Sequence, residues 1–314
     1  MKRFALAMAL LGMFVGTTQA QEEEAKKLLA VCSTTQVADF ARQVVGDRWD
    51  VQCVLAAGQD PHLYEVKPGD ARLVARAAIC LENGWHLEGN EWMKTLAKDA
   101  GKPIISCVTG LKPLELEEDG DTIDDPHAWF SPKNAAVYVN NIARGVSQID
   151  PDHADEYKAR ADFYVQQLRT LHVWIQKEVN SVPKTQRKLI TSHDAFNYFC
   201  SEYGFISAAP AGWSTGDEVG GGITAERRQQ SIKSIRDFGV QAIFVETSVN
   251  PEIIRQIAAD AGVKIGGELY SDSMGGPGTA GESYLGMMRE NVLKSPAHCP
   301  QNRIRRLKNT WNST

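Results

Sequence analysis

Short apolar runs alternate with stretches of helical periodicity in the N-terminal half of the chain. The apolar runs lie at residues 28–32, 49–55, 77–81 and 104–108. Between the first two runs, apolar side chains recur at steps of three and four, at Val37, Phe40, Ala41, Val44 and Val45. Strands that alternate with amphipathic helices are typical of a parallel α/β sheet. We therefore predict an α/β unit in this half.

The same alternation returns in the C-terminal half. Apolar runs that predict strands lie at residues 188–191, 205–208, 242–245 and 263–266. Helical patterns cover residues 225–238 and 251–261. A second α/β unit is expected here, so the fold class is α/β with two parallel-sheet lobes.

One long helix is predicted between the two units. Asp150-Pro151 supplies a helix-capping residue and a proline at the first helical position, and no glycine or proline follows until Pro183. Apolar residues recur at steps of three and four along this stretch, at Ala154, Tyr157, Ala161, Tyr164, Leu168, Leu171, Ile175 and Val179. We predict an N-terminal lobe over 21–149, a linking helix over 150–182, a C-terminal lobe over 183–298 and a tail over 299–314.

The first twenty residues have the pattern of a secretory signal peptide. Lys2 and Arg3 precede an apolar run over 4–15, and small residues end the segment at Ala20. The apolar run is shorter than the roughly 20 residues that a membrane-spanning helix needs. The nearest cysteine, Cys32, lies beyond a charged run, so no lipid attachment is expected at the cleavage site. We predict a soluble periplasmic protein.

Composition and charge agree with this prediction. The chain has 314 residues, of which 43% are hydrophobic and 23% charged, which is typical of a soluble globular protein of two domains. The formal net charge is −5, and it becomes −7 once Lys2 and Arg3 leave with the signal peptide. An acidic chain of this kind is not expected to bind nucleic acid. We interpret the basic run at 303–308 as a solvated tail, and we expect a monomer.

Six cysteines in an exported chain permit disulfides. Four of them, Cys32, Cys53, Cys80 and Cys107, fall inside the predicted strands, and no two cysteines form a Cys-x-x-Cys pair. We expect most cysteines to be unbonded core residues, because buried cysteine packs as a small hydrophobe. A disulfide bridge remains open at this point.

The candidate chemistry rests on three histidines and one aspartate: His62, His127, His193 and Asp272. All four stand where predicted strands give way to loops, the edge at which doubly wound sheets bind ligands. Three imidazoles and a carboxylate are a natural tetrahedral set for Zn(II), and they also serve Mn(II) or Fe(II). Their wide spacing is no local metal signature, but Asp-Pro-His occurs twice, at 60–62 and 125–127.

Several neighbours are candidates for a supporting role. Acidic residues near the histidines could orient the imidazoles through their second nitrogens: Asp60, Glu65, Asp125 and Asp194. Glu246 ends a predicted strand and is left open between such a role and a purely structural one. Aromatic residues expected to wall the site are Tyr64, Trp129 and Phe196. The remaining histidines, His86, His153, His172 and His298, are interpreted as surface or packing residues.

At these motifs the chain resembles the TroA-like solute-binding proteins of zinc, manganese and iron ABC importers. The shared segments are Asp-Pro-His-Leu-Tyr-Glu at 60–65, Asn-Gly-Trp-His-Leu-Glu-Gly at 83–89, Asp-Pro-His-Ala-Trp at 125–129, His-Asp-Ala-Phe-Asn-Tyr-Phe at 193–199, Ile-Phe-Val-Glu at 243–246 and Leu-Tyr-Ser-Asp-Ser-Met-Gly at 269–275. The resemblance implies two lobes joined by a long helix, with one metal ion held in the cleft. Position by position, the implied ligands are His62, His127, His193 and Asp272, and the implied partner is a membrane permease.

The resemblance also bears on which metal is bound. Many manganese-binding relatives have glutamate at the position of His193, so zinc is the first expectation and manganese or iron the next. Two features depart from the family. The segment 115–125 is short and acidic, whereas many zinc-specific relatives have a long histidine-rich loop at this place. Residues 214–222 are glycine-rich where relatives usually contain proline, and we expect a more mobile rim.

These features favour metal capture and delivery over catalysis. Four protein ligands close a tetrahedral site and leave no position for an activated water, so an enzyme is not expected. The alternative is a secreted zinc-dependent hydrolase in which Asp272 acts as a base. Against it, the chain has no His-Glu-x-x-His segment and no serine nucleophile motif. A surface adhesin is a third hypothesis, which the absence of a lipid-attachment cysteine disfavours.

Overall fold

The structure is a computed structural model of the 314-residue chain. It describes residues 27–118, 121–208, 225–240, 242–248 and 251–295. The predicted signal peptide, the tail over 299–314 and the glycine-rich segment over 214–222 lie outside the described residues. Among the helices that are described, none combines the length and the apolar character that crossing a membrane requires.

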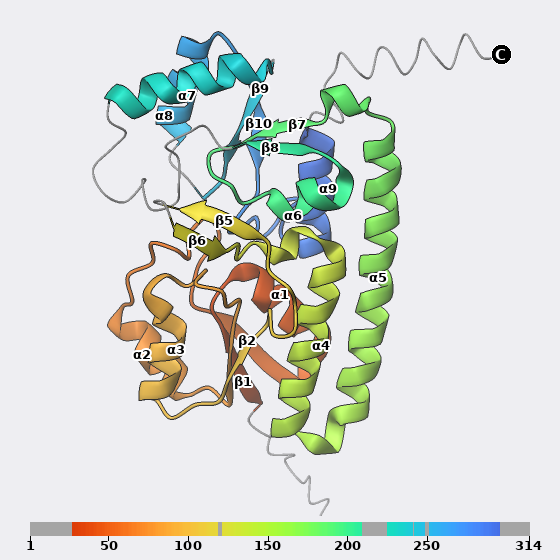
Figure 1. Ribbon diagram of the computed structural model, residues 1–314. Coiled ribbons are helices and arrows are strands. Elements are labelled where there is room, and N and C mark those ends of the chain that lie inside the picture. Colours follow the sequence, from red (N-terminus) through yellow and green to blue (C-terminus); the bar gives the residue numbers. More distant parts are fainter. Residues whose placement is uncertain (1–26, 119–120, 209–224, 241, 249–250, 296–314) are drawn as a thin grey trace, which may run out of the picture.

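The N-terminal lobe is a four-stranded parallel sheet of order β2-β1-β3-β4 (Figure 1). Its elements are β1 (Leu28–Cys32), α1 (Thr35–Val45), β2 (Trp49–Cys53), α2 (Pro68–Ala75), β3 (Ile79–Glu82), α3 (Trp92–Asp99), β4 (Ile104–Ser106) and α4 (Pro132–Ile149). Alternate residues of β1 pack against opposite layers: Ala30 joins a core with α1 and α4, and Val31 joins one with α2 and α3. Burial on both faces explains the continuous apolar runs in the sequence.

The C-terminal lobe has two parallel strand pairs, β7 with β8 and β9 with β10, and β7 lies against β9. Its elements are β7 (Lys188–Ile190), α6 (Asn197–Tyr203), β8 (Ile206–Ala208), α7 (Ala225–Phe238), β9 (Ala242–Glu246), α8 (Pro251–Ala261), β10 (Lys264–Leu269) and α9 (Tyr284–Lys294). An isoleucine-rich core joins β9 to α7 and α8. The predicted α/β class with two parallel-sheet lobes is confirmed.

The predicted long helix is present as α5 (Ala154–Asn180), about 40 Å long at 1.5 Å per residue. Its buried face carries the residues that the sequence pattern predicts, from Tyr157 and Ala161 to Ile175 and Val179. It packs on α1 and α4 of the first lobe and on α9 and α6 of the second, so it contacts both. A separate 3-10 turn, η4 (Pro151–His153), precedes it. The division of the chain at residues 149 and 183 stays a prediction.

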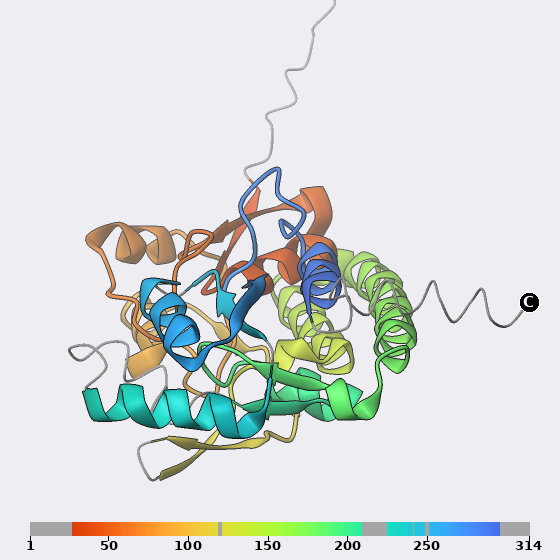
Figure 2. The same ribbon diagram turned by 90° about the horizontal axis from the view of Figure 1, so that it is seen from above.

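An antiparallel hairpin of β5 (Glu115–Glu118) and β6 (Asp121–Asp124) was not predicted. It lies at the edge of the molecule in the view from above (Figure 2). The sequence signal is weak here because each four-residue strand contains a single large apolar residue, Leu116 in β5 and Ile123 in β6. The strand register even places Glu115 opposite Asp124 and Glu118 opposite Asp121, which like charges disfavour. The hairpin leads directly into the loop of His127.

Five cysteines lie in the described part of the chain and none of the five is in a disulfide: Cys32, Cys53, Cys80, Cys107 and Cys200. All but Cys53 are buried. The expectation that most cysteines are unbonded core residues is confirmed for the four buried ones, and Cys53 is unbonded but only partly buried. The sixth, Cys299, lies outside the described residues.

Candidate metal-binding site

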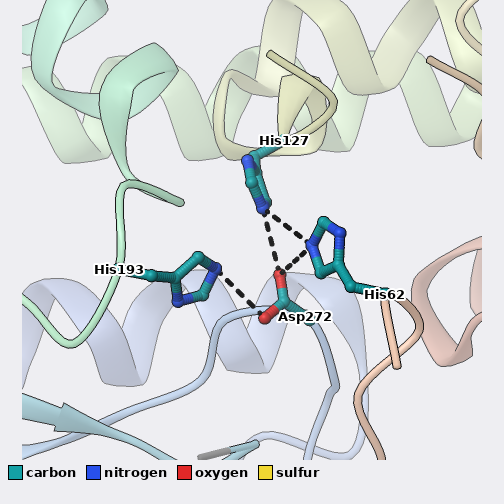
Figure 3. A group of neighbouring side chains, drawn as sticks. All are labelled: His62, His127, His193 and Asp272. Carbon is teal, nitrogen blue, oxygen red and sulfur yellow. Dashed lines mark hydrogen bonds and ion pairs between the residues drawn. The ribbon is translucent and has the colours of Figure 1, made fainter. Parts of the chain in front are cut away.

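His62, His127, His193 and Asp272 meet between the lobes (Figure 3). One potential ligand atom of each lies within 4.8 Å of the others. His193 and Asp272 follow β7 and β10 by three residues, as expected for the carboxyl ends of strands. His62 stands farther from its strand, β2, and His127 follows the hairpin strand β6. Each lobe therefore contributes two residues.

The interior of this group is built from Nε2 atoms and carboxylate oxygens. Nε2 of His62 lies 3.3 Å from Nε2 of His127 and 4.0 Å from Oδ1 of Asp272. Nε2 of His127 lies 3.4 Å from Oδ1 of Asp272, and Nε2 of His193 lies 3.3 Å from Oδ2. His62 is partly exposed, whereas the other three side chains are buried. Three nitrogens and one carboxylate thus face a common centre.

The loop of His62 packs against the first residue of α3 and the segment that precedes this helix. The indole of Trp92 donates a hydrogen bond of 3.0 Å to the carbonyl of Pro61. A Cβ atom at Gly89 would lie only 2.1 Å from the carbonyl oxygen of His62, so only glycine fits. Asp60 accepts the backbone N–H of His62 at 2.8 Å. Asp60 therefore shapes the loop, and it does not hold the ring as the sequence suggested.

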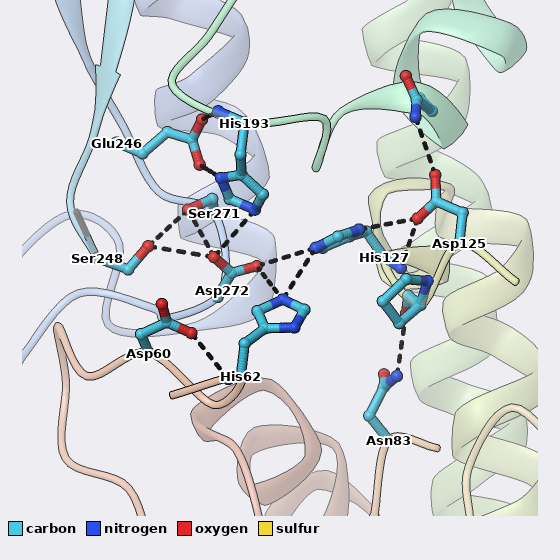
Figure 4. A network of polar contacts seen from close by, with 12 residues as sticks. Asp60, His62, Asn83, Asp125, His127, His193, Glu246, Ser248, Ser271 and Asp272 are labelled. Atoms are coloured by element: carbon cyan, nitrogen blue, oxygen red, sulfur yellow. Dashed lines mark hydrogen bonds and ion pairs between the residues drawn. The ribbon is translucent and has the colours of Figure 1, made fainter. Parts of the chain in front are cut away.

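His127 is held by Asp125, as the repeated Asp-Pro-His motif predicted. Oδ1 of Asp125 accepts the backbone N–H of His127 at 2.9 Å and lies 2.8 Å from its ring Nδ1. The amide of Asn83, which is labelled in Figure 4, donates to the carbonyl of Pro126 at 2.9 Å. Tyr138 donates to Asn83 Oδ1. A proton on Nδ1 leaves the lone pair of Nε2 pointing at the centre of the group.

His193 is held by Glu246 at the end of β9. Oε1 of Glu246 accepts the backbone N–H of His193 at 3.1 Å, and Oε2 lies 2.7 Å from the ring Nδ1. The sequence had offered Asp194 for this role and had left Glu246 open. The structure assigns the contact to Glu246, which comes from a neighbouring strand rather than from the loop of His193.

Two buried atoms of the group are without a hydrogen-bond partner: Nε2 of His193 and Oδ1 of Asp272. A buried polar atom left unsatisfied costs about 1–3 kcal/mol. Both atoms face the common centre, where a cation would satisfy them together. The other carboxylate oxygen, Oδ2, is contacted by the hydroxyls of Ser248 and Ser271. The donor set and its orientation therefore fit a transition-metal ion.

The electrostatics of the group separate His62 from the other histidines. Burial lowers the pKa of His62 to about 3. Burial opposes the charge of His127 too, but contacts with Asp125 and Asp272 outweigh it and raise the pKa of His127 to about 9. In the same way, Glu246 and Asp272 raise the pKa of His193 well above its ordinary value. Without metal, protons compete for two of the three nitrogens.

The other candidates lie at the margin of the group or away from it. Trp129 contacts the ring of His127, with 5.4 Å between ring centroids. Tyr64 packs on Trp92 and Phe196 packs on Phe130, so their described ring contacts are with other aromatics. Glu65 and His86 are exposed, His153 is partly exposed and contacts Asp150, and His172 contacts Tyr203. His298 lies outside the described residues.

Comparison with known protein families gives one match over most of the chain. Residues 30–294 match the family described as zinc-uptake complex component A, periplasmic. The manganese-binding lipoprotein MntA of Halalkalibacterium halodurans is 32% identical over 271 residues, which cover 86% of this chain and 88% of that protein. The metal ABC transporter substrate-binding lipoprotein SloC of Streptococcus mutans is 31% identical, and the alignment covers 94% of this chain and 98% of that protein.

Solved structures show the same fold. The periplasmic zinc-binding protein TroA of Treponema pallidum superimposes with a TM-score of 0.79 at 29% identity, covering 87% of this chain and 99% of that one. A manganese-bound periplasmic metal-binding protein of Candidatus Liberibacter asiaticus gives a TM-score of 0.75 at 26% identity, with 86% and 98% covered. The two solved relatives are thus described with different metals.

Proposed function

Since the chain belongs to the family of the periplasmic zinc-uptake component A, we propose that it captures one transition-metal ion through His62, His127, His193 and Asp272. The ion is cargo, which the protein passes to the membrane permease of an ABC importer. Relatives named as substrate-binding components of metal ABC transporters support this role. We further propose that the protein works outside the cytoplasm as a monomer and does not act on nucleic acid.

One observation carries the proposal: four ligand atoms from four loops converge, and two of them are buried without a partner. Catalytic zinc sites have three protein ligands and keep one position for water or substrate. A set of four protein ligands fills a tetrahedron and holds the ion without activating water. Asp125 and Glu246 fix two of the imidazoles by their second nitrogens, an arrangement that supports metal binding and firm ligand geometry.

We propose zinc as the preferred ion, with manganese or iron as the alternatives. Three nitrogens and one carboxylate suit the borderline-soft Zn(II), whereas additional oxygens favour Mn(II). Several relatives are named for manganese, and the matched family is named for zinc. His193 supports zinc, because it places a nitrogen at the third ligand position.

The competing function is that of a secreted zinc-dependent hydrolase, and Asp272→Ala separates the two. As a carrier, the variant should keep three histidine ligands, bind zinc with lower affinity and show at most slow hydrolysis through a water at the vacated position. As a hydrolase, the parent protein would already be active, and loss of its base would abolish turnover while metal affinity stays nearly intact.

The experiment measures zinc affinity and the hydrolysis of ester, amide and phosphate substrates for parent and variant side by side, with and without chelator. Asp162→Ala serves as the control, because Asp162 is exposed on α5 and pairs only with Lys158 among the described contacts. An inactive parent and a weakened variant support the carrier. An active parent whose variant binds equally well but turns nothing over overturns it.

A further inference from the structure

We propose that the hydroxyls of Ser248 and Ser271 occupy one oxygen of Asp272, so that this carboxylate binds metal through its other oxygen alone. The two serines then act as positioning residues that favour a four-coordinate ion over ions that take more ligands. This inference rests on the proposed function of metal capture. It concerns how the site selects its ion.

The two oxygens of Asp272 have different surroundings (Figure 4). Oδ2 lies 3.2 Å from the hydroxyl of Ser248 and 3.3 Å from that of Ser271. Oδ1 is buried without a hydrogen-bond partner and faces the imidazoles of His62 and His127. The oxygen free to bind an ion is therefore Oδ1.

The hydroxyl hydrogens can be distributed in only a few ways. The two serine oxygens also lie 2.8 Å from each other, and each hydroxyl has a single hydrogen to donate. Either both hydroxyls donate to Oδ2, or one donates to the other and the second donates to Oδ2. In every arrangement that satisfies the network, Oδ2 accepts at least one hydrogen bond from a serine hydroxyl.

Ser271 is itself held in place, and Ser248 follows a residue that already contacts the group. Ser271 is fully buried, and its carbonyl accepts a hydrogen bond of 3.0 Å from the amide of Gln36 in α1. Ser248 stands two residues after Glu246, which holds His193. Glu246 at the end of β9 thus contacts His193, and Ser248 just after the strand contacts Asp272.

The position of His193 shows what the serines prevent. Nε2 of His193 lies 3.3 Å from Oδ2, so without the serine hydroxyls both oxygens of Asp272 would be available to an ion that this nitrogen binds. A carboxylate that binds through both oxygens raises the coordination number from four to five. Zn(II) binds tetrahedrally in closed protein sites, whereas Mn(II) suits sites that are richer in oxygen. Removing the serine hydroxyls from Oδ2 should therefore favour the binding of Mn(II) relative to that of Zn(II).

The test compares wild type with a double variant, Ser248→Ala with Ser271→Ala, loaded with Co(II) as a spectroscopic substitute for Zn(II). Four-coordinate Co(II) absorbs visible light much more strongly than five- or six-coordinate Co(II). We expect strong absorption from wild type and weaker absorption from the double variant. Competition titrations should show the Zn/Mn affinity ratio falling about tenfold, the lower end of the effect of supporting residues on metal affinity.

Two further variants separate positioning from general damage. Ser248→Thr keeps the hydroxyl and should retain the wild-type spectrum and affinity ratio. Ser147→Ala removes a half-buried serine hydroxyl that bonds a helix carbonyl in α4, and it should change neither quantity. A wild-type spectrum of five or six coordination, or a double variant with the wild-type spectrum and ratio, overturns the inference. A wild type that binds no metal refutes the proposed function as well.

Discussion

The side-chain amide of Asn197 donates a hydrogen bond of 3.1 Å to Oδ2 of Asp125, the carboxylate whose other oxygen holds the ring of His127. The next residue, Tyr198, donates from its hydroxyl to the carbonyl of Asp125 at 2.8 Å. Both donors belong to α6, which follows the loop of His193. His127 and the loop of His193, which carry the second and third proposed ligands, are thereby connected across the two lobes.

Removing this connection should weaken metal binding without unfolding the protein. In Asn197→Ala, Asp125 loses a donor on Oδ2 and holds His127 less firmly. We expect zinc affinity to fall several-fold, by less than the roughly 10- to 100-fold expected for Asp125→Ala. Calorimetric titration with zinc measures both variants. Asn140→Ala, an exposed position on α4, is the matched control. An unchanged affinity in Asn197→Ala would show that the link between lobes does not support the site.

Gly89 provides a test of the packing beneath His62. In Gly89→Ala, the new methyl group would approach the carbonyl oxygen of His62 to within 2.1 Å and must displace the loop. We expect zinc affinity to drop by about tenfold or more, because ligand geometry depends on such support. Gly69→Ala in α2 is the control, since its methyl group meets only the far end of Arg72 at 3.9 Å. Equal affinities for the two variants would refute the role assigned to Gly89.

Replacing His193 with glutamate should shift selectivity from zinc toward manganese by adding an oxygen ligand. Zn(II) should still bind more tightly in absolute terms, following the general stability order. The new carboxylate would face Glu246, which now lies 2.7 Å from the ring of His193. Both affinities should therefore fall in the single variant and partly recover when Glu246→Gln is added. An unchanged or higher Zn/Mn ratio in competition titrations contradicts the argument.

Metal affinity should rise with pH across the neutral range. In the metal-free protein, Asp125 and Asp272 raise the pKa of His127 to about 9, and the pKa of His193 is also raised. Below these pKa values a proton must leave for the ion to bind, and each displaced proton lowers affinity about tenfold per pH unit. His62, with its pKa lowered to about 3, does not compete. Calorimetry in buffers of different ionisation enthalpy counts the protons released. A pH-independent affinity between about 6 and 8 would exclude His127 and His193 as ligands.

Much of the fold follows from local sequence signals. The run at 28–32 and the helix stripe from Tyr157 to Val179 predict β1 and α5 because burial imposes its periodicity on the residues. The hairpin at 115–124 could not be predicted in this way. Its strands carry acidic residues opposite one another at both ends, and Leu116 opposite Ile123 is the one pair of large apolar residues between them.

The candidate ligands were predictable, but their supports were only partly so. Asp125 stands two residues from His127, and so a local motif reveals it. Glu246 is 53 residues from His193, and Ser248 is 24 residues from Asp272, so these contacts depend on how β9 lies beside the loops. No spacing in a single sequence encodes such contacts. Asp194 was the wrong choice for His193 because adjacency along the chain does not bring its carboxylate to the ring.

The most direct test of the central claim is the metal content of the purified chain after reconstitution with excess zinc and removal of unbound ion. Elemental analysis should return one equivalent of zinc per chain for wild type, because the four converging residues form a single site. The same procedure should return far less for a variant that combines His127→Ala with His193→Ala. Two equivalents in wild type, none, or full retention by the double variant would contradict the account.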